Sequence, residues 1–304
     1  MQPKQESQSA LVVSMMRAIH SLNDANPIID DPYGFDLISR DERLSMRERL
    51  SSRLAKTGVW PAHNYRREDD ALAWALRAFP GYGNVIIRTR YLEDRLGQAL
   101  RRGLSQYVVL GAGLDTFCFR VPDFVSSLRI FEIDHPSTQA MKKKRLATAG
   151  LTLPCEVAYI PTDFERETIS EALRSSDFNQ DKPAFFSWMG VSPYLSRQAH
   201  LDTFQSFSES AAADSELVFT YIKAPASRHS GAAPQIRSIM SNTSEPVLSR
   251  FDPEEVWNML QEHGIEVVED VGPNEIVNRY CSGRRDGLRP TWHFRIVHAR
   301  RPPP

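Results

Sequence analysis

Cysteine and long apolar segments are both scarce in this 304-residue chain. Its three cysteines, Cys118, Cys155 and Cys281, stand far apart and form no Cys-x-x-Cys pair. This spacing excludes a disulfide framework and fits a reducing compartment. No apolar run approaches the length that crosses a bilayer, and the first residues lack the apolar stretch of a signal peptide. The sequence therefore predicts a soluble cytoplasmic protein.

The chain also lacks an excess of charge and any familiar metal-binding pattern. It holds 37 basic and 38 acidic residues, for a net charge of −1, so nothing indicates a nucleic-acid groove. The eight histidines include no His-Glu-x-x-His or similar spacing, so we expect no metal site. With 41% hydrophobic residues, the chain can bury a large core, in one elaborated domain or a domain with a cap.

A glycine turn between two apolar segments is the most informative feature that is present. Residues 107–116 are Tyr-Val-Val-Leu-Gly-Ala-Gly-Leu-Asp-Thr, and a second apolar segment ends at Asp134. A strand that leads into Gly111 and Gly113, followed by a strand that ends in a carboxylate, is typical of nucleotide pockets in parallel α/β sheets. The glycines let the backbone approach a ligand closely. Asp134 is placed to accept hydrogen bonds from both ribose hydroxyls.

The turn lacks the third glycine of a dinucleotide-binding site. Asp115 and Thr116 stand where the phosphate of a dinucleotide would lie. A fixed carboxylate repels a pyrophosphate but attracts a cationic ligand. S-adenosylmethionine has no phosphate and carries an ammonium and a sulfonium group. The turn therefore favours this cofactor over NAD.

Helical and strand patterns divide the chain into two parts. Residues 1–84 show helical spacing and no strand, which predicts an N-terminal helical cap. Residues 85–304 alternate strands with helices, which predicts a mostly parallel sheet with right-handed crossovers. The alternation over 291–298 predicts an antiparallel last strand with one buried face, and the Ala-, Ser- and Pro-rich segment 223–250 is interpreted as a lid-like insertion. We expect helices at 8–23, 35–55, 68–79 and 85–102, and strands at 107–110, 128–133, 156–160, 184–188, 216–222, 265–268 and 291–298.

Five short motifs follow one another over about 110 residues. They are Arg88–Tyr91, Gly111–Thr116, Phe131–Pro136, Thr162–Phe164 and Gly190–Leu195. Together with Ser9-Ala10-Leu11 and Asp31-Pro32-Tyr33 near the N-terminus, they resemble the leucine carboxyl methyltransferase and polyketide O-methyltransferase family. The resemblance implies a class I methyltransferase fold: a Rossmann-like α/β sheet of seven strands, mostly parallel with an antiparallel last strand, and a helical cap over the acceptor site. It also implies S-adenosylmethionine as cofactor.

The resemblance assigns the two ends of the cofactor to different residues. Arg88 would pair with the methionine carboxylate, which a planar guanidinium can hold through two hydrogen bonds, and Arg90 is the nearby alternative. Asp134 would hold the ribose, and Asp163 would accept from the adenine amino group while the backbone of Phe164 contacts the ring. The full set implied to bind the cofactor is Arg88, Gly111, Ala112, Gly113, Asp115, Glu132, Asp134, Asp163, Phe164, Trp188 and Met189.

Some of these positions have alternative interpretations. Glu132 either assists Asp134 or is a buried structural carboxylate. Met189 stands where many relatives carry a glutamate near the cofactor's ammonium, which would then rely on backbone carbonyls, Asp115 or another acid.

Basic side chains outside the motifs have structural interpretations. His20 and His63 can be proposed as bases, but we favour structural or surface roles for both. His135 is interpreted as a spacer beside the ribose carboxylate. The run Lys142–Arg145 is interpreted as a solvated helix face.

The acceptor is less well defined than the cofactor. A carboxylate is ionised at neutral pH and needs no base, whereas a hydroxyl needs one within hydrogen-bond reach. Because no base stands out, we favour O-methylation of a carboxylate on a small molecule or peptide. Tyr194, Arg279 and Tyr280 are the candidates for positioning the acceptor. An NAD-linked oxidoreductase and a non-catalytic regulator that binds S-adenosylmethionine remain as alternatives, and the oligomeric state is left open.

Overall fold

Seven strands form one sheet in the order β3-β2-β1-β4-β5-β7-β6 in the computed structural model, which describes residues 8–56, 58, 68–120, 128–164, 166–225 and 247–303. All strands run in one direction except β7, which is antiparallel to both β5 and β6. This topology confirms the predicted mostly parallel sheet with an antiparallel last strand. The strands are β1 Gln106–Leu110, β2 Arg129–Asp134, β3 Val157–Pro161, β4 Phe185–Trp188, β5 Glu216–Ile222, β6 Glu266–Val271 and β7 Phe294–Arg300.

The burial of the last strand differs from its prediction. Most side chains of β7 are buried, on both of its faces, so the expected single buried face is wrong. The reason is its position: β7 lies between β5 and β6, so helices cover the sheet on both sides of it. Residues 291–293, which were expected to start this strand, form a turn instead. Residues 226–246 of the predicted insertion lie outside the described residues.

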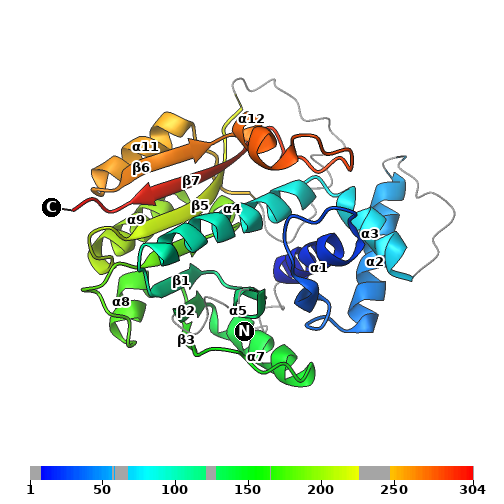
Figure 1. The fold of residues 1–304 in the computed structure, drawn as a ribbon, viewed down its shortest axis with the longest axis horizontal. Helices are drawn as coiled ribbons and strands as arrows, with labels where there is room; N and C mark the ends of the chain where they lie inside the picture. The colour runs from blue at the N-terminus through cyan, green and yellow to red at the C-terminus, as the bar shows by residue number, and fades with distance from the viewer. Residues whose placement is uncertain are drawn as a thin grey trace.

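Two helical layers cover the sheet (Figure 1). Strand side chains alternate between the faces, and those of one face pack with α8, α9 and α11. Those of the other face pack with α4 and α5. The helices of these layers are α4 Tyr82–Arg101, α5 Phe117–Arg120, α8 Ile169–Arg174, α9 Arg197–Ser210 and α11 Pro253–Glu262. The other helices of this part of the chain are α7 Pro136–Thr148, η2 Ser192–Tyr194, α12 Pro273–Ile276 and η3 Val277–Cys281.

The N-terminal helices gather to one side of the sheet, as Figure 1 shows in blue. They are α1 Gln8–Asn23, η1 Pro32–Gly34, α2 Arg40–Lys56 and α3 Glu68–Arg77, and they share an apolar cluster with the first turn of α4. The later turns of α4 pack on the sheet. Because α4 contributes to both clusters, it joins the N-terminal helices to the sheet. The division into two domains at residue 84 stays a prediction.

The basic run Lys142–Arg145 on α7 is not the solvated face that its charge suggests. Lys142 is only 1% exposed, and its Nζ lies 2.6 Å from both carboxylate oxygens of Glu132 on β2. Arg145 contacts Glu42 of α2 at 2.6 Å, and only Lys143 and Lys144 point to solvent. The prediction is wrong because α7 packs beside both the sheet and the N-terminal helices, where Glu132 and Glu42 neutralise the charges of Lys142 and Arg145.

The buried pair gives a stability prediction. Replacing Lys142 with Met should lower the free energy of unfolding by about 3–5 kcal/mol, since it leaves the Glu132 carboxylate buried without a partner. The double variant Glu132→Leu/Lys142→Met, which removes both charges, should recover most of that loss. Urea denaturation measures both values. A single variant within about 1 kcal/mol of the wild type would contradict the prediction.

Candidate functional site

The turn after β1 requires its glycines. Gly111 has a φ of +74°, and a Cβ atom there would lie 2.4 Å from Cγ2 of Val191. Gly113 has a φ of +52°. Both conformations disfavour other residues, and the contact with Val191 leaves no space for a side chain. Ala112, between them, is buried against the α4 side of the sheet.

Asp134, the last residue of β2, is hydrogen-bonded to this turn. Its Oδ2 accepts a hydrogen bond of 2.6 Å from the N–H of Gly113, and its Oδ1 accepts one of 2.6 Å from the N–H of His135. Burial raises the pKa of Asp134, although these amides and the charge of Lys142 oppose the shift. Each oxygen keeps a lone pair for a further donor. The carboxylate can therefore hold a pair of hydroxyls at this edge.

Arg88 is a charged side chain without a partner. Its guanidinium lies against Gly190, where an added Cβ would be 2.0 Å from Nη1. In the described part of the chain, Arg88 makes no hydrogen bond or ion pair. Burial lowers its pKa to about 10, against the opposing influence of Tyr194 and Asp115. The group is charged at neutral pH and fits an anionic ligand such as a carboxylate.

Asp115 lies on the other side of the turn. Its Oδ1 accepts from the N–H of Phe117 at 2.6 Å and so caps the start of α5. Burial alone would raise its pKa, but the charges of Arg120 and Arg17 more than offset this and hold the pKa below its usual value. Asp115 is thus an anion near the turn, as expected for a site that takes a cationic group.

Two candidates stand near the ends of β2 and β3. Asp163 is partly exposed and lies 3.7 Å from Arg166, and the ring of Phe164 is 38% exposed. Both follow β3, next to the end of β2 where Asp134 stands. Glu132 is different, because Lys142 engages both of its oxygens. The structure thus favours the structural interpretation of Glu132.

Trp188, the last residue of β4, and Met189, which follows it, point in opposite directions. Trp188 is 2% exposed and packs among His200, Phe204 and Phe219, on the side of the sheet covered by α9. Its indole is therefore a core side chain. Met189 packs on the α4 side, in the same cluster as Ala112 of the glycine turn.

The acceptor-positioning candidates separate in the structure. Tyr194, in η2, lies near enough to Arg88 to influence its pKa. Arg279 instead makes hydrogen bonds of 3.1 and 2.6 Å to Glu269, and the Tyr280 hydroxyl donates to Asp94 at 3.0 Å. Acidic partners engage both groups, which favours structural roles for them, whereas Tyr194 lies beside Arg88. The positioning roles of Tyr194, Arg279 and Tyr280 stay predictions.

The histidines of the N-terminal half have structural contacts. His20 is buried, accepts from the N–H of Ile28 at 2.9 Å through Nε2, and contacts Asp24 at 2.6 Å through Nδ1. His135 caps α7 by accepting from the N–H of Ser137. His63 lies outside the described residues.

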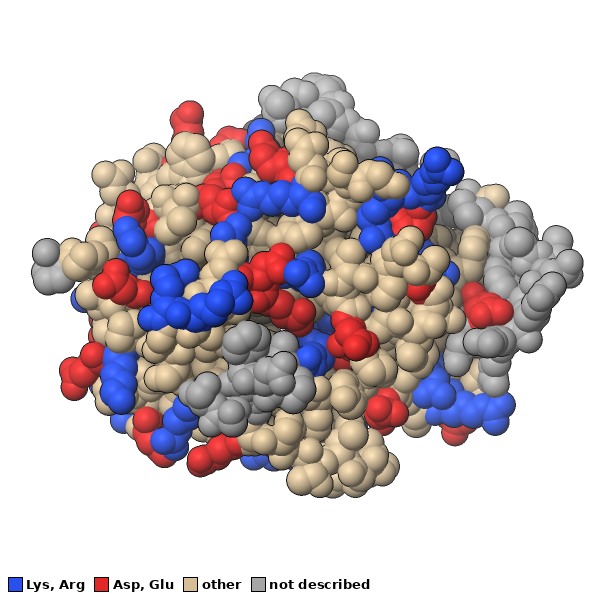
Figure 2. All heavy atoms as spheres, in the orientation of Figure 1, with Lys and Arg blue, Asp and Glu red and all other residues tan. Residues whose placement is uncertain are grey.

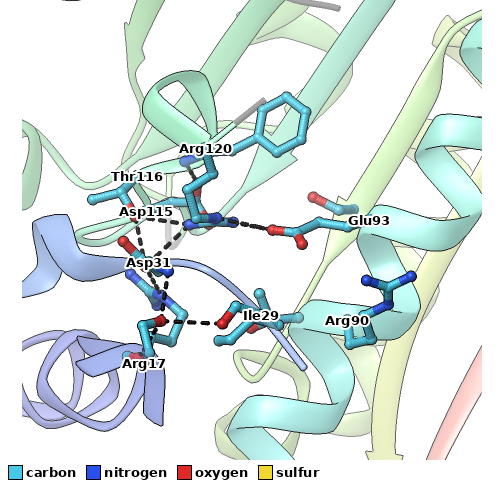
Figure 3. A network of polar contacts seen from close by, with 12 residues as sticks. Arg17, Ile29, Asp31, Arg90, Glu93, Asp115, Thr116 and Arg120 are labelled. Carbon is cyan, nitrogen blue, oxygen red and sulfur yellow. Dashed lines mark hydrogen bonds and ion pairs between the residues drawn. The ribbon is translucent and has the colours of Figure 1, made fainter. Parts of the chain in front are cut away.

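Sequence reasoning missed a polar network behind the turn, drawn in Figure 3. It joins Arg17 of α1, Asp31 and Arg120 of α5, all nearly or fully buried. Asp31 belongs to the Asp-Pro-Tyr segment, but no spacing rule links it to arginines 14 residues before and 89 residues after it.

Other ligand types have little support in the structure. No described group of three His, Cys, Asp or Glu side chains is arranged to hold a metal ion. No described helix combines the length and apolar character needed to span a bilayer. Figure 2 shows basic and acidic side chains interspersed on the face it displays, without a continuous basic surface.

This fold and this site place the protein among the class I S-adenosylmethionine-dependent methyltransferases, and its cofactor is S-adenosylmethionine. The chain belongs to the leucine carboxyl methyltransferase family, whose sequence profile matches residues 10–208. The family assignment thus favours a methyltransferase over the NAD-linked oxidoreductase that the sequence left as an alternative.

Relatives carry names that agree with this assignment, and solved structures share the fold. YktD of Bacillus subtilis, which is named provisionally as an S-adenosylmethionine-dependent methyltransferase, is 29% identical over 302 residues, covering 98% of this chain and 99% of YktD. A similarly named protein of Mycobacterium marinum is 28% identical over 227 residues, covering 75% of this chain and 70% of its own. A DUF574 family protein of Streptomyces avermitilis has a TM-score of 0.57 at 14% identity, with 98% of both chains covered. A Thermobifida fusca protein, provisionally described as a methyltransferase, has a TM-score of 0.52 at 19% identity, covering 84% of this chain and 94% of its own.

The residues present fit this cofactor. Arg88 is a partly buried cation without a partner in the described part of the chain, which suits the methionine carboxylate, and Asp134 offers lone pairs that suit the ribose hydroxyls. Asp115 supplies negative charge near the turn. Arg88, Gly111, Gly113, Asp115 and Asp134 are therefore the residues that we propose to hold it.

Gly190 offers a test of Arg88. In the variant Gly190→Ala, the new Cβ should displace the Arg88 guanidinium and weaken binding of S-adenosylhomocysteine by about 10- to 100-fold, the value of a charge-assisted hydrogen bond. Affinity for 5′-methylthioadenosine, which lacks the amino-acid carboxylate, should change little. Isothermal titration calorimetry measures both affinities.

Gly150→Ala is the matched control. Gly150 also has a positive φ, of +66°, but an added Cβ there meets nothing within 4 Å. Equal losses of S-adenosylhomocysteine affinity in the two variants would show that backbone strain, and not Arg88, is responsible.

Proposed function

We propose that this protein methylates an oxygen atom of a small molecule or peptide, and that the acceptor is a carboxylate. The observation that carries the proposal is a pair of cations without partners beside the site. Lys223 and Arg250 make no ion pair or side-chain hydrogen bond in the described part of the chain. Unpaired cations near a reaction centre favour an anionic acceptor.

Backbone contacts bring the chain segments of these two residues together. Lys223 follows β5, and its N–H donates to the carbonyl of His293 at 2.7 Å. Its backbone also bridges to Phe251, the residue after Arg250. Arg250 is in turn near enough to His293 to lower the pKa of that imidazole. We call Lys223, Arg250 and His293 the β5 cluster.

The β5 cluster lies next to η2, which carries Tyr194. The N–H of Leu248 donates to the carbonyl of Pro193 at 2.8 Å, and the Ser249 hydroxyl donates to the carbonyl of Ser192 at 3.2 Å. Arg250 follows directly in the chain. Tyr194 is near Arg88, so the cluster is close to the end of the site that we assign to methionine.

A second connection comes from the start of α4. The side chain of Asn84 accepts from the N–H of Thr291 at 2.8 Å, two residues before His293. Asn84 and Arg88 are four residues apart on one helix and therefore share a face. The turn at 291–293 is thus held against the same helix as the proposed carboxylate-binding arginine.

The chemistry asks the protein mainly for placement. When bound, S-adenosylmethionine supplies a methyl group that is already activated by a positively charged sulfur. Lys223 and Arg250 would hold the acceptor anion, and the ordered turn would fix the distance to that methyl group. Such alignment can contribute about 7–11 kcal/mol to lowering the barrier. Because a carboxylate is ionised at neutral pH, no proton has to be removed.

His293 favours a hydroxyl as the second candidate acceptor. Its Nδ1 is buried without a hydrogen-bond partner. Burial, together with the charge of Arg250, lowers its pKa, so the imidazole is neutral at neutral pH and can accept a proton. This arrangement suits a general base.

A labelling experiment separates these acceptors. The protein is incubated with methyl-labelled S-adenosylmethionine and a metabolite extract, and the labelled product is treated with mild base. We expect a base-labile ester. A base-stable ether would instead support the hydroxyl acceptor with His293 as base, and the absence of any labelled product would support a non-catalytic regulator.

Variants of the β5 cluster test how the acceptor is held. Lys223→Met and Arg250→Met should each reduce formation of the labelled ester by about 10-fold or more, because a charge-assisted hydrogen bond is lost. The affinity for S-adenosylhomocysteine should stay within about twofold of the wild type, since neither side chain is assigned to the cofactor. Lys144→Met, which removes an exposed cation from α7, is the control. Unchanged ester formation in both cluster variants would exclude the cluster as the acceptor site.

A further inference from the structure

Arg17 connects the N-terminal helical layer directly to the turn after β1. Its Nε donates to Asp31 Oδ2 at 2.6 Å, and its Nη2 donates to the backbone carbonyl of Leu114 at 2.8 Å. Leu114 lies between Gly113 and Asp115, two residues of the proposed cofactor site. One guanidinium thus holds both a carboxylate of the N-terminal segment and the backbone of the turn. Figure 3 shows Arg17 beside Asp31.

The carboxylate of Asp31 is held from the other side by the start of α5. The Thr116 hydroxyl donates to Oδ2 at 2.7 Å, and Arg120 Nη1 lies 3.2 Å from the same oxygen. Arg120 also pairs with Glu93 of α4 at 2.8 Å. Asp31 is fully buried, and these contacts converge on one of its oxygens. The carboxylate therefore has little freedom to move.

The contact with Leu114 bears on the hydrogen bonds of the turn. The N–H of Gly113, which precedes Leu114, donates to Asp134, and the carboxylate of Asp115, which follows it, caps α5. Fixing the carbonyl of Leu114 restricts the peptide groups on both sides, because adjacent peptide planes share a Cα atom. The position of Arg17 is thus transmitted to the groups expected to meet the nucleoside.

We propose that Arg17 is a positioning residue for cofactor binding: it holds the turn from Gly113 to Asp115 through the Leu114 carbonyl, so that the N-terminal helices complete the nucleoside site. This inference concerns cofactor affinity and is independent of the acceptor. Its test needs no acceptor and no turnover.

A purely structural role for Arg17 is the competing explanation, and the chain contains a matched control for it. Arg145 of α7 donates to the carbonyl of Leu37 at 3.0 Å and contacts Glu42 at 2.6 Å. Like Arg17, Arg145 holds one backbone carbonyl and one carboxylate, and it links the N-terminal segment to the α/β part of the chain. Neither of these two contacts involves a residue of the glycine turn.

The experiment compares Arg17→Met with Arg145→Met by thermal unfolding and by calorimetric titration with two ligands. The ligands are S-adenosylhomocysteine and 5′-methylthioadenosine, which keeps the adenosine but lacks the amino-acid part. Both variants should lower the Tm. Only Arg17→Met should weaken both ligands, by about tenfold or more.

Each other outcome overturns the proposal. Unchanged affinity in Arg17→Met, or equal losses in Arg145→Met, would leave Arg17 as a structural link alone. A loss confined to S-adenosylhomocysteine would make Arg17 a direct contact of the amino-acid part instead. If Arg17→Met fails to fold, Arg17→Lys replaces it, because lysine keeps the charge beside Asp31 but lacks the second arm that reaches Leu114. It should weaken both ligands with a Tm near the wild type, and unchanged affinity would again overturn the proposal.

Discussion

The buried carboxylate of Asp31 is the constraint on which the arrangement of this protein depends. A carboxylate removed from water is costly unless cations and hydrogen-bond donors compensate it. Here the compensation comes from Arg17 and Arg120, which belong to helices on either side of the cofactor turn. The N-terminal helices can therefore pack in this position only when the turn after β1 and the start of α5 are also in place. The N-terminal helices and the proposed site are thus linked through one ion cluster.

The charged groups of the proposed site differ in whether they already have partners. Asp134 and Asp115 already accept backbone N–H groups, which orders them before a ligand arrives. Arg88, by contrast, has no partner in the described part of the chain. Asp134 matches the hydroxyls of a ligand, Asp115 matches a cationic centre, and the unpaired Arg88 matches a carboxylate. They do not match the diphosphate of a dinucleotide, for which a carboxylate beside the turn would be repulsive.

Charged residues show where interpretation of the sequence was reliable and where it was not. The glycine turn and the position of Asp134 were predicted correctly because each depends on a short local pattern: a glycine conformation and a carboxylate at a strand end. Lys142 was misjudged because a lysine in a charged run looks the same whether its helix face meets water or a buried Glu132. The contacts of Arg279 and Tyr280 were hidden for a related reason, since their acidic partners Glu269 and Asp94 lie on other elements, and the positioning role of both residues stays a prediction.

The sequence by itself determined the order of strands and helices, the glycine turn and the carboxylate that follows β2, because each depends on residues close together in the chain. Only the tertiary structure decided which charges are paired. Arg17 and Leu114 are 97 residues apart, and Lys223 and His293 meet only where β5 and β7 are antiparallel neighbours. The physical reason is that an ion pair is a property of distance and burial, and both are set by packing between elements rather than by spacing along the chain.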